Sequence, residues 1–97
     1  MSDYSVAGGV GSFEYRRRDS ARFDAALEAV EEAVACYARL RNRAVVSGNA
    51  AEADRLLAGQ AACLTQQQQL RPDDTATVDR ILAEYPALIA WLRDRIG

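Results

Sequence analysis

The sequence predicts an all-α protein, a small three-helix bundle with up-down-up connectivity. Its 97 residues are enough for one domain. Three successive segments repeat apolar residues at alternating spacings of three and four, which is the pattern of an amphipathic helix. Each segment also has acidic side chains near its start and arginines near its end, an arrangement that complements the helix dipole. Periodicity and charge therefore indicate the same three helices.

Residues 1–19 are predicted to form a flexible N-terminal tail, which leaves residues 20–97 as the helical domain. Residues 6–12 contain three glycines and favour no regular structure. The same tail holds Tyr4, Phe13 and Tyr15, which are three of the seven aromatic residues in the chain. Docking of this tail on a partner or on the bundle is therefore an alternative. The basic triplet at residues 16–18 is balanced by three acidic residues in the tail, so it makes a weak anion site.

The first helix is expected to start near Asp19 or Ser20, since either side chain can cap free backbone N–H groups. It is expected to run to about Val46, where Ser47 and Gly48 stop it. Its apolar face has two lines, the second made mostly of small residues that let another helix approach closely: Phe23, Leu27, Val30, Val34 and Tyr37, and then Ala26, Ala29, Ala33, Cys36 and Leu40.

The second helix is expected to open at Asn49, with Glu52 completing a capping-box pattern. Gly59 weakens its middle by about 1 kcal/mol relative to alanine. Residues 71–74 contain a proline and two aspartates, which end this helix and cap the next. The apolar face of the second helix comprises Leu56, Leu57, Ala61, Cys63, Leu64 and Leu70.

The third helix has the most regular apolar stripe, and it also contains Pro86. A proline inside a helix removes a backbone hydrogen bond and clashes with the preceding turn, so a kink or a break is expected there. A complete break would give four helices instead of three. The stripe comprises Val78, Leu82, Tyr85, Ile89, Leu92 and Ile96.

Composition argues against several classes of function. The chain has no histidine and no lysine, so it lacks the commonest general base, the commonest metal ligand and any Schiff-base amine. We find no catalytic, cofactor or metal site and expect a protein that is not an enzyme. A net charge of −2 argues against nucleic acid, and the lack of a long apolar run argues against a membrane span.

Composition also bears on source and compartment. Basic residues that are all arginine are typical of a GC-rich, bacterial genome, and the first residues lack the pattern of a signal peptide, so we expect a cytoplasmic protein. Cys36 and Cys63 are then expected to be free, buried thiols. A disulfide between them would need their Cα atoms within about 7 Å.

The expected function is a small, non-catalytic protein–protein interaction module, such as an adaptor, an accessory subunit or a regulatory subunit. The main stripe of the third helix already supplies the apolar width that a bundle helix buries. Ile81, Leu88 and Trp91, together with Arg95, are therefore predicted to form an interaction site for a protein partner or for self-association. The alternative is that a break at Pro86 turns Trp91 inward to cap the core.

Two resemblances supply other functions. A long first helix with the late arginines Arg39 and Arg43 resembles the helical chorismate mutases, which implies a small enzyme that binds an anionic substrate. That family also uses a lysine, which this chain lacks. Clustering of these two arginines with Arg55 around a pocket would favour an enzyme. The hairpin turning near Gly48 resembles secreted helical-hairpin effector proteins, although the tryptophan of their turn is missing and Pro72 interrupts the second arm.

Overall fold

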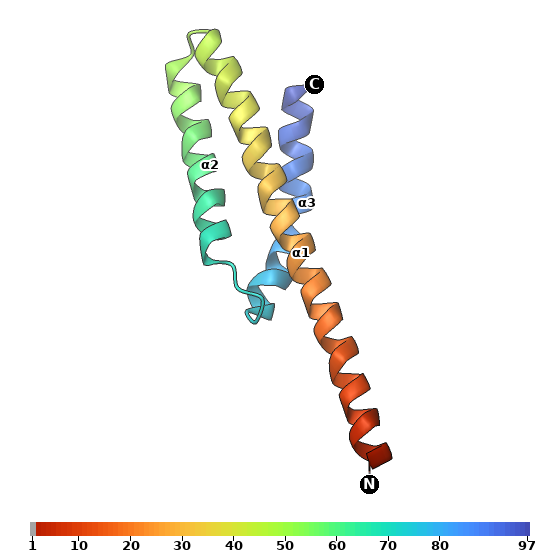
Figure 1. Ribbon diagram of the computed structural model, residues 1–97. Coiled ribbons are helices and arrows are strands. Elements are labelled where there is room, and N and C mark those ends of the chain that lie inside the picture. The colour runs from red at the N-terminus through yellow and green to blue at the C-terminus, as the bar shows by residue number, and fades with distance from the viewer. Residues whose placement is uncertain (1) are drawn as a thin grey trace.

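A computed structural model describes the backbone of residues 2–97 and the side chains of residues 18–97. It contains three helices, α1 (Ser2–Val46), α2 (Ala50–Gln69) and α3 (Thr75–Ile96), and this part of the chain has no strand. Helix α2 turns back along α1, and α3 then runs in the direction of α1 again (Figure 1). The predicted three-helix bundle with up-down-up connectivity is confirmed.

Helix α1 is the element on which the other two pack. Both α2 and α3 lie against α1, but within residues 2–97 no Cα atom of α2 comes within 8 Å of one in α3. Only side chains cross between them: the Arg80 guanidinium donates to the Gln66 amide oxygen at 3.2 Å. The bundle is therefore open along the line between α2 and α3.

Helix α1 is longer than the sequence predicted. It begins at Ser2, so the expected start at Asp19 or Ser20 is wrong. The helical backbone continues through both residues, and their side chains therefore have no free helix end to cap. Figure 1 shows this N-terminal part of α1 reaching beyond the ends of α2 and α3. The flexibility of residues 1–19 stays a prediction, and the docking of Tyr4, Phe13 and Tyr15 concerns side chains outside those that the structure describes.

The predicted turn at Gly48 and the predicted caps Asn49 and Asp74 are confirmed, but Glu52 does not complete a capping box, because its carboxylate pairs with Arg55. Helix α1 ends at Val46, and Gly48 follows with φ of 75°, a left-handed conformation that costs glycine little. The Asn49 side chain then accepts a hydrogen bond from the Glu52 N–H at 3.2 Å. At the start of α3 the Asp74 carboxylate accepts one from the Thr77 N–H at the same distance.

The core lies along α1, whose own buried side chains are mostly alanine and cysteine. The line of small residues on α1 is buried more deeply than the line of large ones, because alanine lets α2 and α3 approach closely. On α2, Leu56 and Cys63 are buried, whereas the predicted core residues Leu57 and Leu64 stay 44% and 40% exposed. The buried residues are Ala26, Val30, Ala33, Cys36, Leu40, Ala44, Ala53, Leu56, Cys63, Leu70, Val78, Ile81, Ile89 and Leu92.

Helix α3 continues through Pro86 without a break, so the four-helix alternative is not observed. Pro86 itself is exposed, and buried residues on both sides of it, Ile81 and Ile89, keep the two halves of α3 on the core. Packing therefore compensates for the one backbone hydrogen bond that the proline removes.

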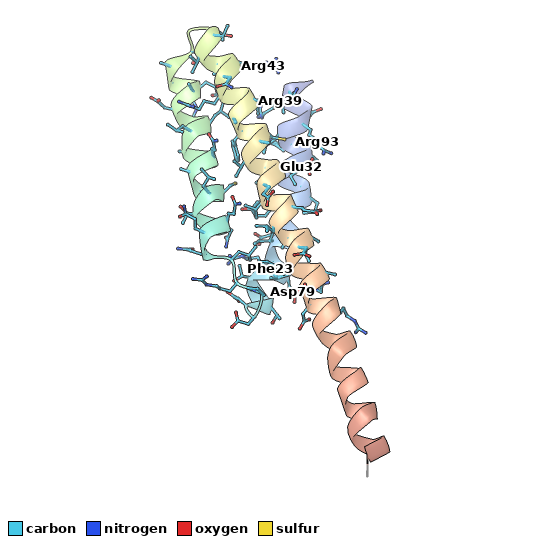
Figure 2. The ribbon with its side chains drawn as sticks, in the orientation of Figure 1. Phe23, Glu32, Arg39, Arg43, Asp79 and Arg93 are labelled. Carbon is cyan, nitrogen blue, oxygen red and sulfur yellow. The ribbon has the colours of Figure 1, made fainter. Side chains whose placement is uncertain are left out.

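Polar contacts at both ends and in the middle fix the position of α3 on α1. Arg22 pairs with Asp79, and Glu32 pairs with Arg93. The Arg43 guanidinium donates to the Ile96 carbonyl at 2.7 Å, where it satisfies the C-terminal end of α3. The labelled side chains in Figure 2 follow this side of α1 from Phe23 to Arg43.

Candidate interaction surface

The structure separates the four residues of the predicted interaction site. Ile81 is only 1% exposed and belongs to the core, so it cannot contribute surface to an interaction site. Leu88 is half-buried at the edge of the core. Trp91 is 49% exposed, and the guanidinium carbon of Arg95 lies 3.8 Å from the centroid of its ring. Leu88, Trp91 and Arg95 therefore remain together on the surface.

The inward alternative for Trp91 is wrong because its neighbour takes the core position. Leu92 is completely buried, and Ile89 is 7% exposed. Each residue of an α-helix is rotated by about 100° from the next, so burial of Leu92 directs Trp91 away from the centre of the core. Because α3 is unbroken, its residues keep this rotational orientation up to the C-terminal end of the helix.

Glu84 belongs to the same surface, although the sequence reasoning did not select it. The residues Glu84, Leu88, Trp91 and Arg95 follow one another at spacings of four, three and four, so they form one line along α3. We call this line the α3 stripe. The spacing of four residues between Glu84 and Leu88 is the signal in the sequence that indicates this position.

A groove of about 580 Å³ lies beside the α3 stripe, between α2 and α3, and Tyr37 of α1 is among the residues that line it. Glu84 and Leu88 belong both to the stripe and to the wall of the groove. The groove and the α3 stripe therefore share one edge. Its lining residues are Tyr37, Gly59, Ala62, Cys63, Gln66, Arg80, Glu84, Tyr85 and Leu88.

The thiol and the two tyrosine hydroxyls in the groove are held in their protonated forms, because the pKa of each is raised. Burial raises the pKa of the Cys63 thiol above its usual range. Burial, together with the hydrogen bond that its hydroxyl donates to the Cys63 sulfur at 3.8 Å, raises the pKa of Tyr85 to about 12. Burial likewise raises the pKa of Tyr37. A thiol with a raised pKa is a poor nucleophile at neutral pH.

Gly59 allows Tyr37 to reach its position in the groove. A Cβ atom on Gly59 would lie 2.4 Å from Cε1 of Tyr37 and 2.9 Å from its hydroxyl oxygen. The ring therefore rests directly on the backbone of α2. This contact gives a physical role to a glycine that the sequence marked only as a weak point of the helix.

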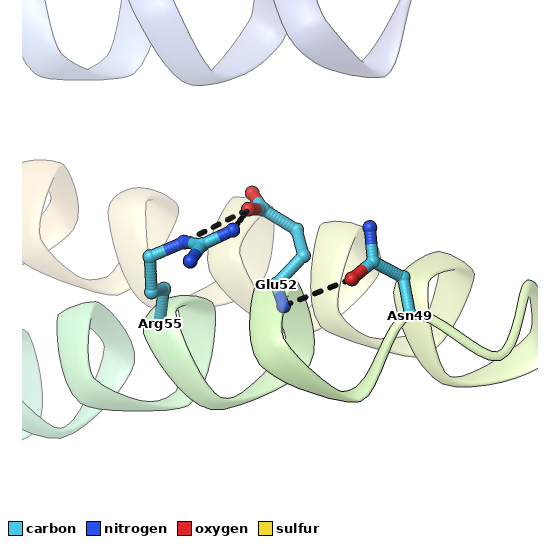
Figure 3. Close-up of polar contacts among 3 residues, drawn as sticks. All are labelled: Asn49, Glu52 and Arg55. Atoms are coloured by element: carbon cyan, nitrogen blue, oxygen red, sulfur yellow. Dashed lines mark hydrogen bonds and ion pairs between the residues drawn. The ribbon is translucent and has the colours of Figure 1, made fainter.

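The arginines that an enzyme would need do not converge on the groove. Arg43 binds the C-terminal carbonyls of α3, and Arg55 pairs with Glu52 on its own helix at 2.7 Å (Figure 3). Arg39 is exposed on α1, and none of the three lines the groove. The clustering on which the anionic-substrate alternative depended is not observed.

Cys36 and Cys63 are both free and buried, as predicted. Among the residues that the structure describes, no three His, Cys, Asp or Glu side chains gather as a metal site would require. In the same part of the chain no helix has the length and apolar character needed to cross a bilayer. No family model, curated protein or solved structure matches this chain.

Proposed function

We propose that this chain is a small, non-catalytic protein–protein interaction module that binds through the α3 stripe and the adjoining groove. The single observation that carries the proposal is Trp91, which is 49% exposed on a helix that otherwise packs well on α1. A large aromatic side chain is among the residues that contribute most to binding at protein interfaces. Burial of the remaining half of this side chain supplies the driving force.

The contact with Arg95 prepares Trp91 for binding. The arginine stacked on the ring restricts its rotamers before any partner arrives, so less side-chain entropy is lost on association. Leu88, half-buried next to it, adds apolar area. Rigid aromatic, aliphatic and arginine side chains together form the usual composition of an interface core.

Within this proposal the chain acts as an adaptor, an accessory subunit or a regulatory subunit of a bacterial cytoplasmic complex. Basic residues that are all arginine support the bacterial part of this assignment, and the absence of histidine supports the non-catalytic part.

Trp91→Ala tests the proposal, with Leu57→Ala as the matched control because Leu57 is 44% exposed on α2. Binding to a partner or to a second copy, followed by light scattering or titration, should weaken by about 2 kcal/mol or more for Trp91→Ala. The melting temperature of the unassociated chain should change little in both variants. A Trp91→Ala variant that binds everything the unmodified chain binds, with equal affinity, would contradict the proposal.

A further inference from the structure

We infer that the α3 stripe binds the α3 stripe of a second copy of this chain, with the two helices antiparallel. This inference rests on the proposed function and specifies the partner. The observation behind it is the order of the stripe: an acidic residue, two apolar residues and then a basic residue, at Glu84, Leu88, Trp91 and Arg95.

This order is complementary to itself when it is reversed. Glu84 precedes Leu88 by four residues, and Arg95 follows Trp91 by four residues. When a second α3 lies antiparallel along the first, Glu84 therefore faces Arg95 of the second copy, while Leu88 faces Trp91 of the second copy. A two-fold axis makes each of these contacts twice, as in any isologous dimer.

The two charges at the ends of the stripe are available for such pairing. Among the side chains of residues 18–97, ion pairs engage Arg22, Arg55 and Arg93, whereas Glu84 and Arg95 take part in none. Arg95 is held over the Trp91 ring instead, which places its guanidinium beside the apolar centre of the stripe. Each copy thus offers one unpaired carboxylate and one unpaired guanidinium at matching positions.

The groove provides room for the second helix. Glu84 and Leu88 form part of its wall, and Gly59 and Ala62 form part of the wall on α2. The Tyr37 ring already covers Gly59, but the exposed and small side chain of Ala62 lets a second α3 at the mouth of the groove contact α2 as well as α3. It would take the place of the fourth helix that this open bundle lacks.

The stripe covers about 16 Å of helix, at 1.5 Å for each residue. A contact of this length is at the small end of specific interfaces, so we expect a dissociation constant in the micromolar range. Sedimentation velocity over micromolar concentrations therefore suits the measurement. Trp91 is the only tryptophan in the chain, so its fluorescence reports the same event without a label.

Charge reversal tests the antiparallel register. Glu84→Arg alone places two arginine pairs face to face, and Arg95→Glu alone places two glutamate pairs face to face. Each variant should lose self-association by about tenfold or more, because attraction becomes repulsion at two symmetric positions. A mixture of the two variants restores both pairs, so it should form a heterodimer with the affinity of the unmodified chain. Asp94→Arg and Arg71→Glu are matched controls, since these exposed residues lie off the stripe.

Each outcome decides the inference. Loss in the single variants and recovery in the mixture would establish the antiparallel pairing. An unmodified chain that stays monomeric through the micromolar range, or single variants that associate normally, would overturn it. The proposed function fails separately, because it requires that Trp91→Ala weaken binding to some partner, including one that is not a second copy.

Discussion

Replacement of Gly59 by alanine sets two effects of opposite sign against each other in the middle of α2. Alanine favours the helical backbone over glycine by about 1 kcal/mol. The new Cβ, however, would lie 2.4 Å from Cε1 and 2.6 Å from Cζ of Tyr37. The ring would have to withdraw by about 1 Å to reach an ordinary carbon–carbon separation. The variant therefore measures how firmly the bundle holds Tyr37 over the backbone of α2.

We expect the steric effect to prevail. Overpacking of a well-packed site costs about 1–3 kcal/mol, which exceeds the gain in helix propensity over most of that range. Gly59→Ala should thus destabilise the chain by up to about 2 kcal/mol, which lowers the melting temperature of a domain this small by several degrees. In a Tyr37→Ala background the ring is gone, and the same substitution should stabilise by about 1 kcal/mol.

Urea unfolding of the four proteins of this double-mutant cycle gives the coupling energy, which should be about 1–3 kcal/mol. Gly48→Ala is the matched control. Gly48 has φ of 75° with nothing within 4 Å of its Cβ position, so its substitution should cost the same free energy in both backgrounds. The reasoning is refuted if Gly59→Ala stabilises the chain equally with and without the Tyr37 ring.

Three further predictions concern the thiols, the pH dependence and the N-terminal residues. Cys36 and Cys63 are 7% and 4% exposed, so a thiol reagent should label them slowly in the native chain and rapidly in denaturant; fast native labelling of both would contradict their burial. Tyr85 has a folded pKa of about 12, above the unfolded value near 10, so its contribution to stability is complete below about pH 10 and is lost as the pH rises toward 12. Urea unfolding across that pH range should show that the free energy of unfolding falls. The fall should be smaller in Tyr85→Phe, which lacks the hydroxyl. A chain that lacks residues 1–19 should unfold with unchanged cooperativity by circular dichroism, because it keeps the buried core and the ion pair between Arg22 and Asp79; a broad transition would show that these residues are structural.

The helices and their ends could be predicted because local interactions determine them. Asn49 and Asp74 act as caps through hydrogen bonds that span only three residues. The start of α1 could not be predicted in the same way. Asp19 and Ser20 have the chemistry of caps, but a cap residue acts only where the helix ends, and the three glycines upstream lower helix propensity without forbidding a helix.

The burial of each face was harder to predict than the helices. Spacing shows which residues share a face, but it does not show which of two adjacent faces meets the neighbouring helix. On α1 the line containing Ala26 and Ala33 proved to be the deeper one, because small side chains allow the closest approach. On α3, Trp91 is exposed and Leu88 is half-buried, whereas Ile81 is buried in the core.

The alanines of the core limit the free energy that the chain gains from burial. Each buried methylene contributes about 0.8 kcal/mol, so a core that relies on alanines such as Ala33, Ala44 and Ala53 gains little free energy from each position. Under the proposed function, Trp91 and its neighbours complete their burial against another molecule. If a second copy is that molecule, association stabilises the fold by mass action, and the melting temperature should rise with protein concentration in the unmodified chain but not in Trp91→Ala.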